Sequence, residues 1–139
     1  MDKALLDTDI FSEILKGRNE SVARNASAYR QQFRRYTLSA ITVMEVVKGL
    51  QQVNRHDHID VLLSALSAEE ILAFDRETAQ VAGRIYGELE RTGRPIGRAD
   101  PMVAAIALQH KLVLVTGNVK HFERIQSLGF PLSVCDWRT

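Results

Sequence analysis

Three carboxylates in this sequence stand at positions from which they can act together. Asp7 follows the apolar run that begins at Lys3, while Glu45 and Asp100 lie near the starts of two predicted helices. In an open parallel sheet, functional groups gather beyond the carboxyl ends of the strands. We therefore expect these three side chains to reach one rim of a sheet, where Thr116 would also lie at the end of another apolar run.

Carboxylates that converge without a basic partner repel one another unless a cation neutralises them. Cys135 is the only cysteine, which excludes a cysteine-rich metal site. We expect no metal ligation by His56, His58 or His110, which are too isolated or too polar in context. Hard oxygen donors without thiolates or clustered imidazoles favour Mg²⁺ or Mn²⁺. We expect His121 at the surface or on the substrate side, and Cys135 as a small buried hydrophobe.

Each acidic residue also has a purely structural interpretation. Thr42-Val-Met-Glu45 matches the capping box that opens a helix, and Asp100 followed by proline matches a helix start. Asp9 fits the first turn of a helix, where its charge suits the helix dipole, and it fits a metal ligand equally well. Taken alone, the residues favour cap roles for Glu45 and Asp100 and a functional role for Asp7.

Apolar runs and helical periodicities alternate along the chain. Short apolar segments predict strands at residues 3–7, 37–41, 70–74 and 112–116. Apolar residues at helical spacing predict helices that end at Gly17, cover 19–35, 42–52 and 59–66, run from Asp75 to Gly93, and start at Asp100. Strands that alternate with helices favour an α/β fold, a three-layer α/β/α domain with a mainly parallel central sheet. No repeat or linker divides the chain, so we expect one domain spanning residues 1–139.

The composition is that of an ordinary folded protein. The chain has 139 residues, of which 45% are hydrophobic and 25% charged, and its formal net charge is +1. These values disfavour disorder and a disulfide scaffold, and bulk charge predicts no polyanionic or membrane partner. No apolar stretch approaches the roughly 20 residues of a membrane helix, and the N-terminus lacks a signal-peptide pattern. We therefore expect a cytoplasmic protein without membrane association.

Four segments in succession resemble the motifs of PIN-domain nucleases. They are Leu5-Leu-Asp7-Thr8-Asp9, Leu38 to Gly49, Ile96 to Ala105, and Leu114 to Phe122. Their order and spacing and the chain length are similar to those of the toxin halves of bacterial toxin-antitoxin pairs, the VapC family. The resemblance covers essentially the whole chain.

The resemblance implies a metal-dependent endoribonuclease. Asp7, Glu45 and Asp100 would hold Mg²⁺ or Mn²⁺, and a metal-bound water would attack a phosphodiester of the RNA. Thr116 and Asn118 would line the catalytic site. Many relatives carry a further acid in this last motif, so the neutral Asn118 argues against a tightly bound second metal. The resemblance also implies a cognate antitoxin that covers the site, and a homodimer.

Local charge supports an RNA partner where net charge does not. Segment 16–35 is rich in arginine with Glu20 as its sole acid, and further arginines precede Asp100. Basic side chains beside catalytic acids suit a nucleic-acid backbone. The predicted RNA-binding residues are Arg24, Arg30, Arg34, Arg94 and Arg98. A solvated helix face is the alternative for each group.

Two other functions fit parts of the sequence. Asp7-Thr-Asp9 and Leu112 to Gly117 resemble the first two motifs of haloacid-dehalogenase-like phosphatases. The short segment after Thr116, however, lacks the later paired aspartates and an obvious catalytic lysine. A PIN-like fold that binds RNA or a protein without cleavage is the other alternative, and the neutral Asn118 supports it. Mg²⁺-dependent cleavage of RNA separates these functions.

Overall fold

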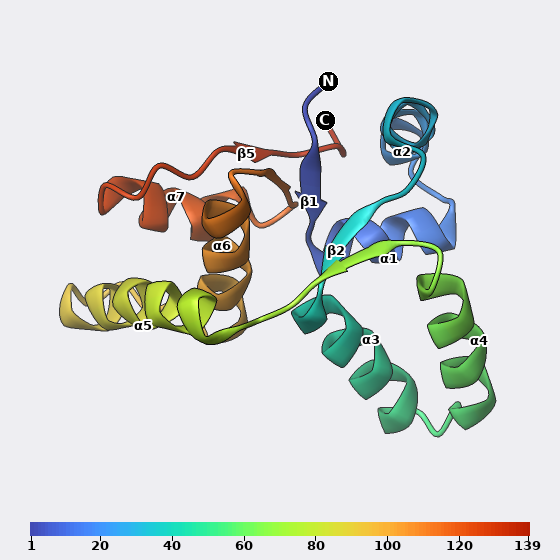
Figure 1. Ribbon diagram of the computed structural model, residues 1–139, viewed down its shortest axis with the longest axis horizontal. Coiled ribbons are helices and arrows are strands. Elements are labelled where there is room, and N and C mark those ends of the chain that lie inside the picture. The colour runs from blue at the N-terminus through green and yellow to red at the C-terminus, as the bar shows by residue number, and fades with distance from the viewer.

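A computed structural model describes residues 1–139 and contains a five-stranded sheet with the strand order β3-β2-β1-β4-β5 (Figure 1). The strands are β1 (Ala4–Leu6), β2 (Thr37–Ser39), β3 (Glu70–Leu72), β4 (Val113–Val115) and β5 (Val134–Cys135). All neighbouring strands are parallel, which confirms the predicted parallel sheet. Every strand therefore ends at the same edge, which we call the carboxyl edge.

β1 lies at the centre of the sheet because its side chains are apolar and fully covered. Ala4, Leu5 and Leu6 are each no more than 3% exposed. A strand buried on both faces requires such an uninterrupted apolar run. Leu5 pairs with Thr37 of β2 and with Leu114 of β4. The end of β1 therefore lies between the ends of β2 and β4.

Seven helices cover the sheet in two layers. They are α1 (Thr8–Lys16), α2 (Glu20–Phe33), α3 (Ala40–Gln52), α4 (His56–Leu66), α5 (Arg76–Arg91), α6 (Ala99–His110) and α7 (Val119–Ser127). One core joins the sheet to α5, α6 and α7, through residues such as Ile85, Ile106 and Phe122. The other core joins it to α1, α2, α3 and α4, through residues such as Ile10, Val46 and Leu62. Figure 1 shows the two groups on opposite sides of the strands, which confirms the three-layer α/β/α architecture. None of the helices combines the length and apolar character needed to span a bilayer.

Two helices begin earlier than the sequence predicted. β2 ends at Ser39, and the Ser39 hydroxyl oxygen accepts a hydrogen bond from the Thr42 N–H at 3.2 Å. Ser39 is therefore the N-cap of α3, and the predicted capping box is wrong because Glu45 lies in the second turn of this helix. Similarly, α6 begins one residue before Asp100, so Asp100 lies within the first turn and is not the N-cap.

The chain after β4 contains two elements that the sequence did not predict. α7 begins at Val119, and β5 pairs with β4 as an edge strand. Cys135 in β5 is exposed, so the predicted burial of this side chain is wrong. Its apolar sequence neighbours suggested burial, but an edge strand has a neighbouring strand on one side only.

Tyr29 ties α2 to the central strand. Its side chain is fully buried. Its hydroxyl accepts a hydrogen bond from the Ala4 N–H at 3.1 Å and donates one to the Ala4 carbonyl at 3.2 Å. The ring packs against Trp137, with 5.7 Å between ring centroids. One hydroxyl group thus satisfies two backbone groups of a buried strand residue.

We expect Tyr29→Phe to lower the free energy of unfolding by about 1–3 kcal/mol, because it leaves buried polar groups of Ala4 without a partner. Urea unfolding followed by circular dichroism measures this change. Tyr86→Phe, at a half-buried tyrosine of α5, is the control and should have little effect. Equal stability of the parent and Tyr29→Phe would contradict the anchoring role of the hydroxyl.

Candidate active site

Asp7 is the residue around which an acidic cluster is built. It follows β1 directly and is the N-cap of α1, with its Oδ1 accepting the Thr8 N–H at 2.9 Å. Its other oxygen, Oδ2, accepts a hydrogen bond from the Thr116 hydroxyl at 2.8 Å. Asp7 is only 5% exposed. The central strand and the helix that follows it therefore fix this carboxylate at the carboxyl edge.

Thr8 connects Asp7 with Glu45. The Thr8 hydroxyl donates a hydrogen bond to Oε1 of Glu45 at 2.6 Å, and it lies 2.9 Å from the hydroxyl of Thr42. Glu45 and Thr42 both belong to α3, which follows β2 at the carboxyl edge. The Glu45 carboxylate is thus directed to α1 rather than to the start of its own helix. This contact replaces the cap role that the sequence suggested.

The turn after β4 forms another side of the cluster. Thr116 is fully buried, and its Oγ1 accepts the Asn118 N–H at 3.0 Å in addition to donating to Asp7. Asp9, in the first turn of α1, accepts the Gly117 N–H on Oδ2 at 2.8 Å. The turn is therefore fastened to the start of α1 at two points. The structure places Thr116 and Asn118 beside Asp7, and their roles in cleavage stay predictions.

Asp100 reaches the cluster from α6 and contacts α7. Its Oδ2 lies 2.8 Å from Nδ1 of His121, and the two side chains are 17% and 43% exposed, respectively. The predicted N-cap role of Asp100 is wrong, because its carboxylate is engaged by the neighbouring helix and no side chain caps α6. His121, which was expected at the surface or on the substrate side, keeps part of its ring exposed and is also the direct partner of an acidic residue.

Burial and like charge dominate the electrostatics of the cluster. Burial, and after it the negative charge of Asp9, raise the pKa of Asp7 to about 7. The charge of Asp100 adds a smaller increase, and hydrogen bonds from Thr116 and Thr8 oppose the rise without cancelling it. Burial also raises the pKa of Asp9 above its ordinary value. The cluster is therefore short of positive charge, which a bound cation would supply.

The donor atoms of the cluster suit a hard divalent cation, since the candidate ligands Asp7, Glu45 and Asp100 all offer carboxylate oxygens. As the side chains lie, no three Asp, Glu, His or Cys residues are close enough together to hold one ion. Glu45 is engaged by Thr8 and Asp100 by His121. These carboxylates would have to exchange their hydrogen bonds for metal contacts. The chemistry of the site thus fits Mg²⁺ or Mn²⁺, provided that side chains rotate to bind it.

Two of the predicted RNA-binding arginines lie away from the cluster. Arg30 pairs with Glu69 at 2.7 Å and stacks on Tyr36 at 4.1 Å from the ring centroid. Both partners immediately precede strands, so this contact lies at the edge opposite the carboxyl edge. Arg34 caps the same end of α2. The structure therefore does not bring Arg30 and Arg34 to the acidic residues.

The other three predicted RNA-binding arginines are exposed. Arg24 lies within α2, and Arg94 donates a hydrogen bond to Ser127 at the far end of α7. Arg98 is the N-cap of α6 and stands two residues before Asp100. Of the predicted set, Arg98 is therefore the one that adjoins an acidic residue in sequence. Phosphate binding by all five arginines stays a prediction.

Sequence reasoning missed two contacts of the cluster. Thr8 is the first residue of α1, a position that turns a hydroxyl back toward the sheet edge, but no sequence pattern indicates its contact with Glu45. His121 lies in the first turn of α7, and its pairing with Asp100 depends on how α6 and α7 approach one another. The sequence left two roles open for Asp9, a helix-start residue and a metal ligand. In the structure Asp9 occupies the first turn of α1 and accepts a hydrogen bond from the turn after β4.

Comparison with known proteins identifies similar chains along nearly the full length. The sequence profile of the PIN domain matches residues 4–128. The tRNA(fMet)-specific endonuclease VapC of Shigella flexneri is 32% identical over 129 residues, which cover 92% of this chain and 96% of that protein. Ribonuclease VapC2 of Haemophilus influenzae is 33% identical over the same shares of the two chains. The DNA-bound VapBC structure from Salmonella typhimurium has a TM-score of 0.79 and 31% identity and covers 99% of both chains.

We expect Asp7→Asn to stabilise the metal-free protein above about pH 7 and to change its stability little near pH 4. The folded parent holds the Asp7 proton up to about pH 7, whereas the unfolded chain releases it near pH 3.8. Parent stability therefore falls relative to the variant as the pH rises between these values. The amide keeps the N-cap acceptor, so α1 is preserved. Thermal unfolding in EDTA across this pH range measures the difference.

Asp75→Asn, at another aspartate N-cap, is the matched control. Hydrogen bonds from Thr78 hold the pKa of Asp75 below its ordinary value, so its stabilising effect is lost only at lower pH. We expect the difference between this variant and the parent to be constant from about pH 4 to pH 8. A difference for Asp7→Asn that does not grow with pH would contradict the energetic cost of ionising the buried Asp7 carboxylate.

Proposed function

The chain belongs to the PIN-domain family, among the VapC ribonuclease toxins of toxin-antitoxin systems, and from this premise we propose that it is an endoribonuclease that requires Mg²⁺ or Mn²⁺. One observation supports the metal requirement. The buried carboxylate of Asp7 shares its surroundings with Asp9 and Asp100, and together with burial their charge raises the pKa of Asp7 to about 7. Carboxylates crowded in this way are suited to bind a divalent cation at neutral pH.

Asp7, Glu45 and Asp100 would hold the cation. Bound there, a divalent ion supplies a water of lowered pKa and a positive charge against the phosphate. The Thr116 hydroxyl orients Asp7, and the Thr8 hydroxyl orients Glu45. Such hydrogen-bonding partners hold the carboxylates at the carboxyl edge, from which they would rotate to reach a cation.

Asn118 would face the RNA rather than act as a charged ligand. It is the N-cap of α7, and its side chain makes no capping hydrogen bond. The amide and the N-terminus of this helix are both suited to contact a phosphate oxygen. The absence of a carboxylate at this position favours one tightly bound cation over two.

Membership of the PIN-domain family excludes the phosphatase alternative, which depended on two short motifs. The remaining alternative is a PIN-like module that binds RNA without cleavage. Both of the cap roles that explained Glu45 and Asp100 structurally are absent from the fold. Both carboxylates instead contact neighbouring elements at the carboxyl edge, Glu45 through Thr8 and Asp100 through His121. A position at this edge, rather than at a helix cap, favours catalysis.

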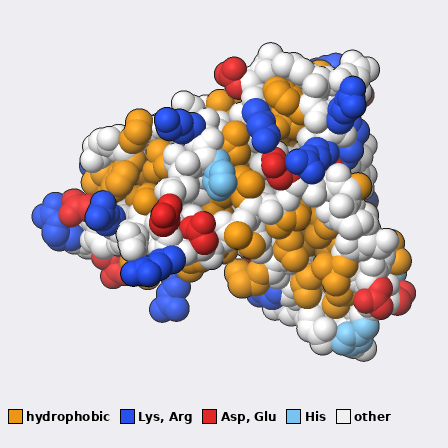
Figure 2. Space-filling model, viewed as in Figure 1, with side chains coloured by type: hydrophobic (Ala, Val, Ile, Leu, Met, Phe, Trp, Pro, Cys, Tyr) orange, Lys and Arg blue, Asp and Glu red, His pale blue; other side chains and the backbone are white.

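We further propose a cognate antitoxin as the protein partner, since the similar Salmonella typhimurium structure is a VapBC complex. Figure 2 shows hydrophobic side chains gathered over α3 and α4. Met44, Val53, Val61 and Leu63, on or beside these helices, are 43–68% exposed. An exposed apolar patch of this kind is typical of a protein interface. Met44 lies on α3, the helix that also carries Glu45. A homodimer stays a prediction, which light scattering can measure.

Cleavage of RNA by the purified protein is expected to require Mg²⁺ or Mn²⁺ and to stop in EDTA, and Ca²⁺ should not replace them. Glu45→Gln and Asp100→Asn should each abolish cleavage and weaken Mn²⁺ binding, because each removes one negative charge from the site. The amides can keep the hydrogen bonds with Thr8 and His121, so stability should change by less than about 1 kcal/mol. Gel assays, calorimetric titration with Mn²⁺ and thermal unfolding measure the three effects.

Glu90→Gln, at an exposed carboxylate on α5, is the control and should cleave RNA like the parent. Cleavage that persists in excess EDTA would refute the metal requirement. If Glu45→Gln or Asp100→Asn cleaves RNA at the parental rate at limiting Mg²⁺, that residue is not part of the active site. Binding of RNA without cleavage under any metal would favour the non-catalytic alternative.

Val61→Lys should weaken the complex with the antitoxin at least tenfold, because it places a charge in the apolar patch over α3 and α4. The measurement is co-purification and titration with the antitoxin proposed above. Gln80→Lys, on the exposed face of α5, is the matched control and should leave the affinity unchanged. The same loss of affinity in both variants, or unchanged affinity in both, would argue against this patch as the docking surface.

A further inference from the structure

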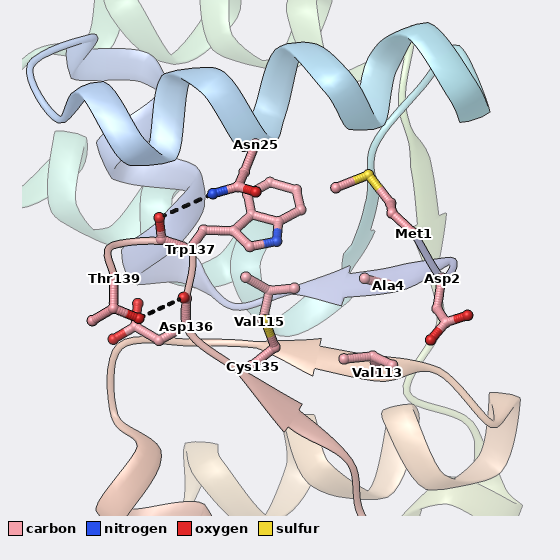
Figure 3. A pocket seen from close by; sticks show the side chains of 10 residues that line it. All are labelled: Met1, Asp2, Ala4, Asn25, Val113, Val115, Cys135, Asp136, Trp137 and Thr139. Carbon is pink, nitrogen blue, oxygen red and sulfur yellow. Dashed lines mark hydrogen bonds between the residues drawn. The ribbon is translucent and has the colours of Figure 1, made fainter.

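The segment that follows β5 is fixed against α2. Trp137 is 5% exposed, and its carbonyl accepts hydrogen bonds from Ser21 at 2.7 Å and from Asn25 at 3.3 Å. Figure 3 shows the Trp137 ring between α2, which carries Asn25, and the strands below. The Thr116 N–H donates to the Cys135 carbonyl at 2.9 Å, which joins the end of β5 to the turn after β4. The residue after Trp137 is thereby held at the carboxyl edge.

That residue, Arg138, lies on the backbone of the turn. Its Nη2 donates a hydrogen bond to the Gly117 carbonyl at 2.9 Å. Its Nε and its backbone N–H both donate to Oδ1 of Asp136, at 3.3 and 2.9 Å. A Cβ atom at position 117 would collide with the guanidinium group. Glycine at this position thus leaves the space that the Arg138 side chain occupies.

This arrangement brings a positive charge to the acidic cluster. Gly117 donates its N–H to Asp9 and accepts Arg138 on its carbonyl, so a single residue joins the two side chains. Arg138 is also ion-paired with Asp136, at 3.3 Å between Nε and Oδ1. An arginine therefore adjoins the carboxylates that would otherwise repel a phosphodiester.

Arg138 keeps donors free for a ligand. Its side chain is 39% exposed, and the protein engages Nε and one N–H of Nη2. The N–H groups of Nη1 point to no protein acceptor, and a planar guanidinium with free N–H groups suits the oxygens of a phosphate. Arg30, which pairs with Glu69 and stacks on Tyr36, differs from Arg138 in lying at the opposite edge of the sheet.

We propose that Arg138 binds an RNA phosphate that neighbours the scissile phosphate, and that Gly117 positions Arg138 for this contact. The inference rests on the proposed RNA cleavage and adds a residue to its substrate-binding surface. A flanking phosphate gains equally from the contact before and during the reaction. Loss of the contact is therefore expected to raise KM and leave kcat unchanged.

Arg138→Gln and Gly117→Ala test the two parts of the proposal. Gln removes the charge, whereas Ala at position 117 displaces an intact guanidinium from the turn. We expect each variant to raise KM for a short single-stranded RNA roughly three- to tenfold at constant kcat. The double variant should be no worse than Arg138→Gln alone, because Gly117 acts through Arg138.

A direct binding measurement complements the kinetics. All proteins carry Asp7→Asn to prevent cleavage, and fluorescence anisotropy of a fluorescein-labelled single-stranded RNA reports affinity at several salt concentrations. Arg138→Gln should reduce the slope of log Kd against log salt by roughly 0.7, the value for one lost phosphate contact. Arg138→Lys should keep the slope and lose affinity, since it keeps the charge but not the planar group. Arg35→Gln, at the opposite edge, is the control and should change neither quantity.

Unchanged KM and salt slope in both Arg138→Gln and Gly117→Ala would overturn the proposal. Increases in KM that add up in the double variant would also overturn it. Thermal unfolding checks that the variants are folded. If the parent cleaves no RNA with any divalent cation, the proposed activity fails, whereas a reduced salt slope in Arg138→Gln still supports the phosphate contact. The two failures are therefore distinguishable.

Discussion

The burial of the Asp7 carboxylate at the end of the central strand is the constraint on which the rest of the site depends. An ionised group in this position is unfavourable, and the neighbouring charges of Asp9 and Asp100 make it more so. The hydrogen bonds from Thr8 and Thr116 offset only part of this cost. The fold therefore keeps an energetically unfavourable carboxylate that a divalent cation would stabilise, which is the behaviour expected of a metal-dependent active site.

The parallel topology explains why residues far apart in the chain meet here. β1 lies between β2 and β4, so α1, α3 and the turn after β4 all begin at the same edge. Thr8 joins the first two of these elements, Asp9 joins the first to the third through Gly117, and the same glycine holds Arg138. Arg138, which is also paired with Asp136, thus adjoins one side of the cluster. Glu45 and Asp100 would exchange their hydrogen bonds with Thr8 and His121 for contacts with a cation.

Much of the fold follows from the sequence, because uninterrupted apolar runs such as Ala4–Leu6 and Val113–Val115 belong to buried parallel strands. Local cap patterns were less reliable. Thr42–Glu45 matches a capping box, but Ser39 precedes it and caps the helix first. Helical periodicity also does not reveal which end of a helix faces the site. Arg30, on a well-predicted helix, therefore lies at the opposite edge, whereas Arg138, without a pattern of its own, adjoins the cluster.

We propose that a divalent cation compensates the charge that crowds Asp7. The most direct measurement is a carbon-13 NMR titration of the Asp7 carboxyl group, assigned by comparison with Asp7→Asn and recorded in EDTA and in Mg²⁺. We expect a pKa of about 7 in EDTA and a pKa below the ordinary range of aspartate in Mg²⁺. An ordinary pKa in EDTA, or a raised pKa that does not respond to Mg²⁺ or Mn²⁺, would contradict the claim.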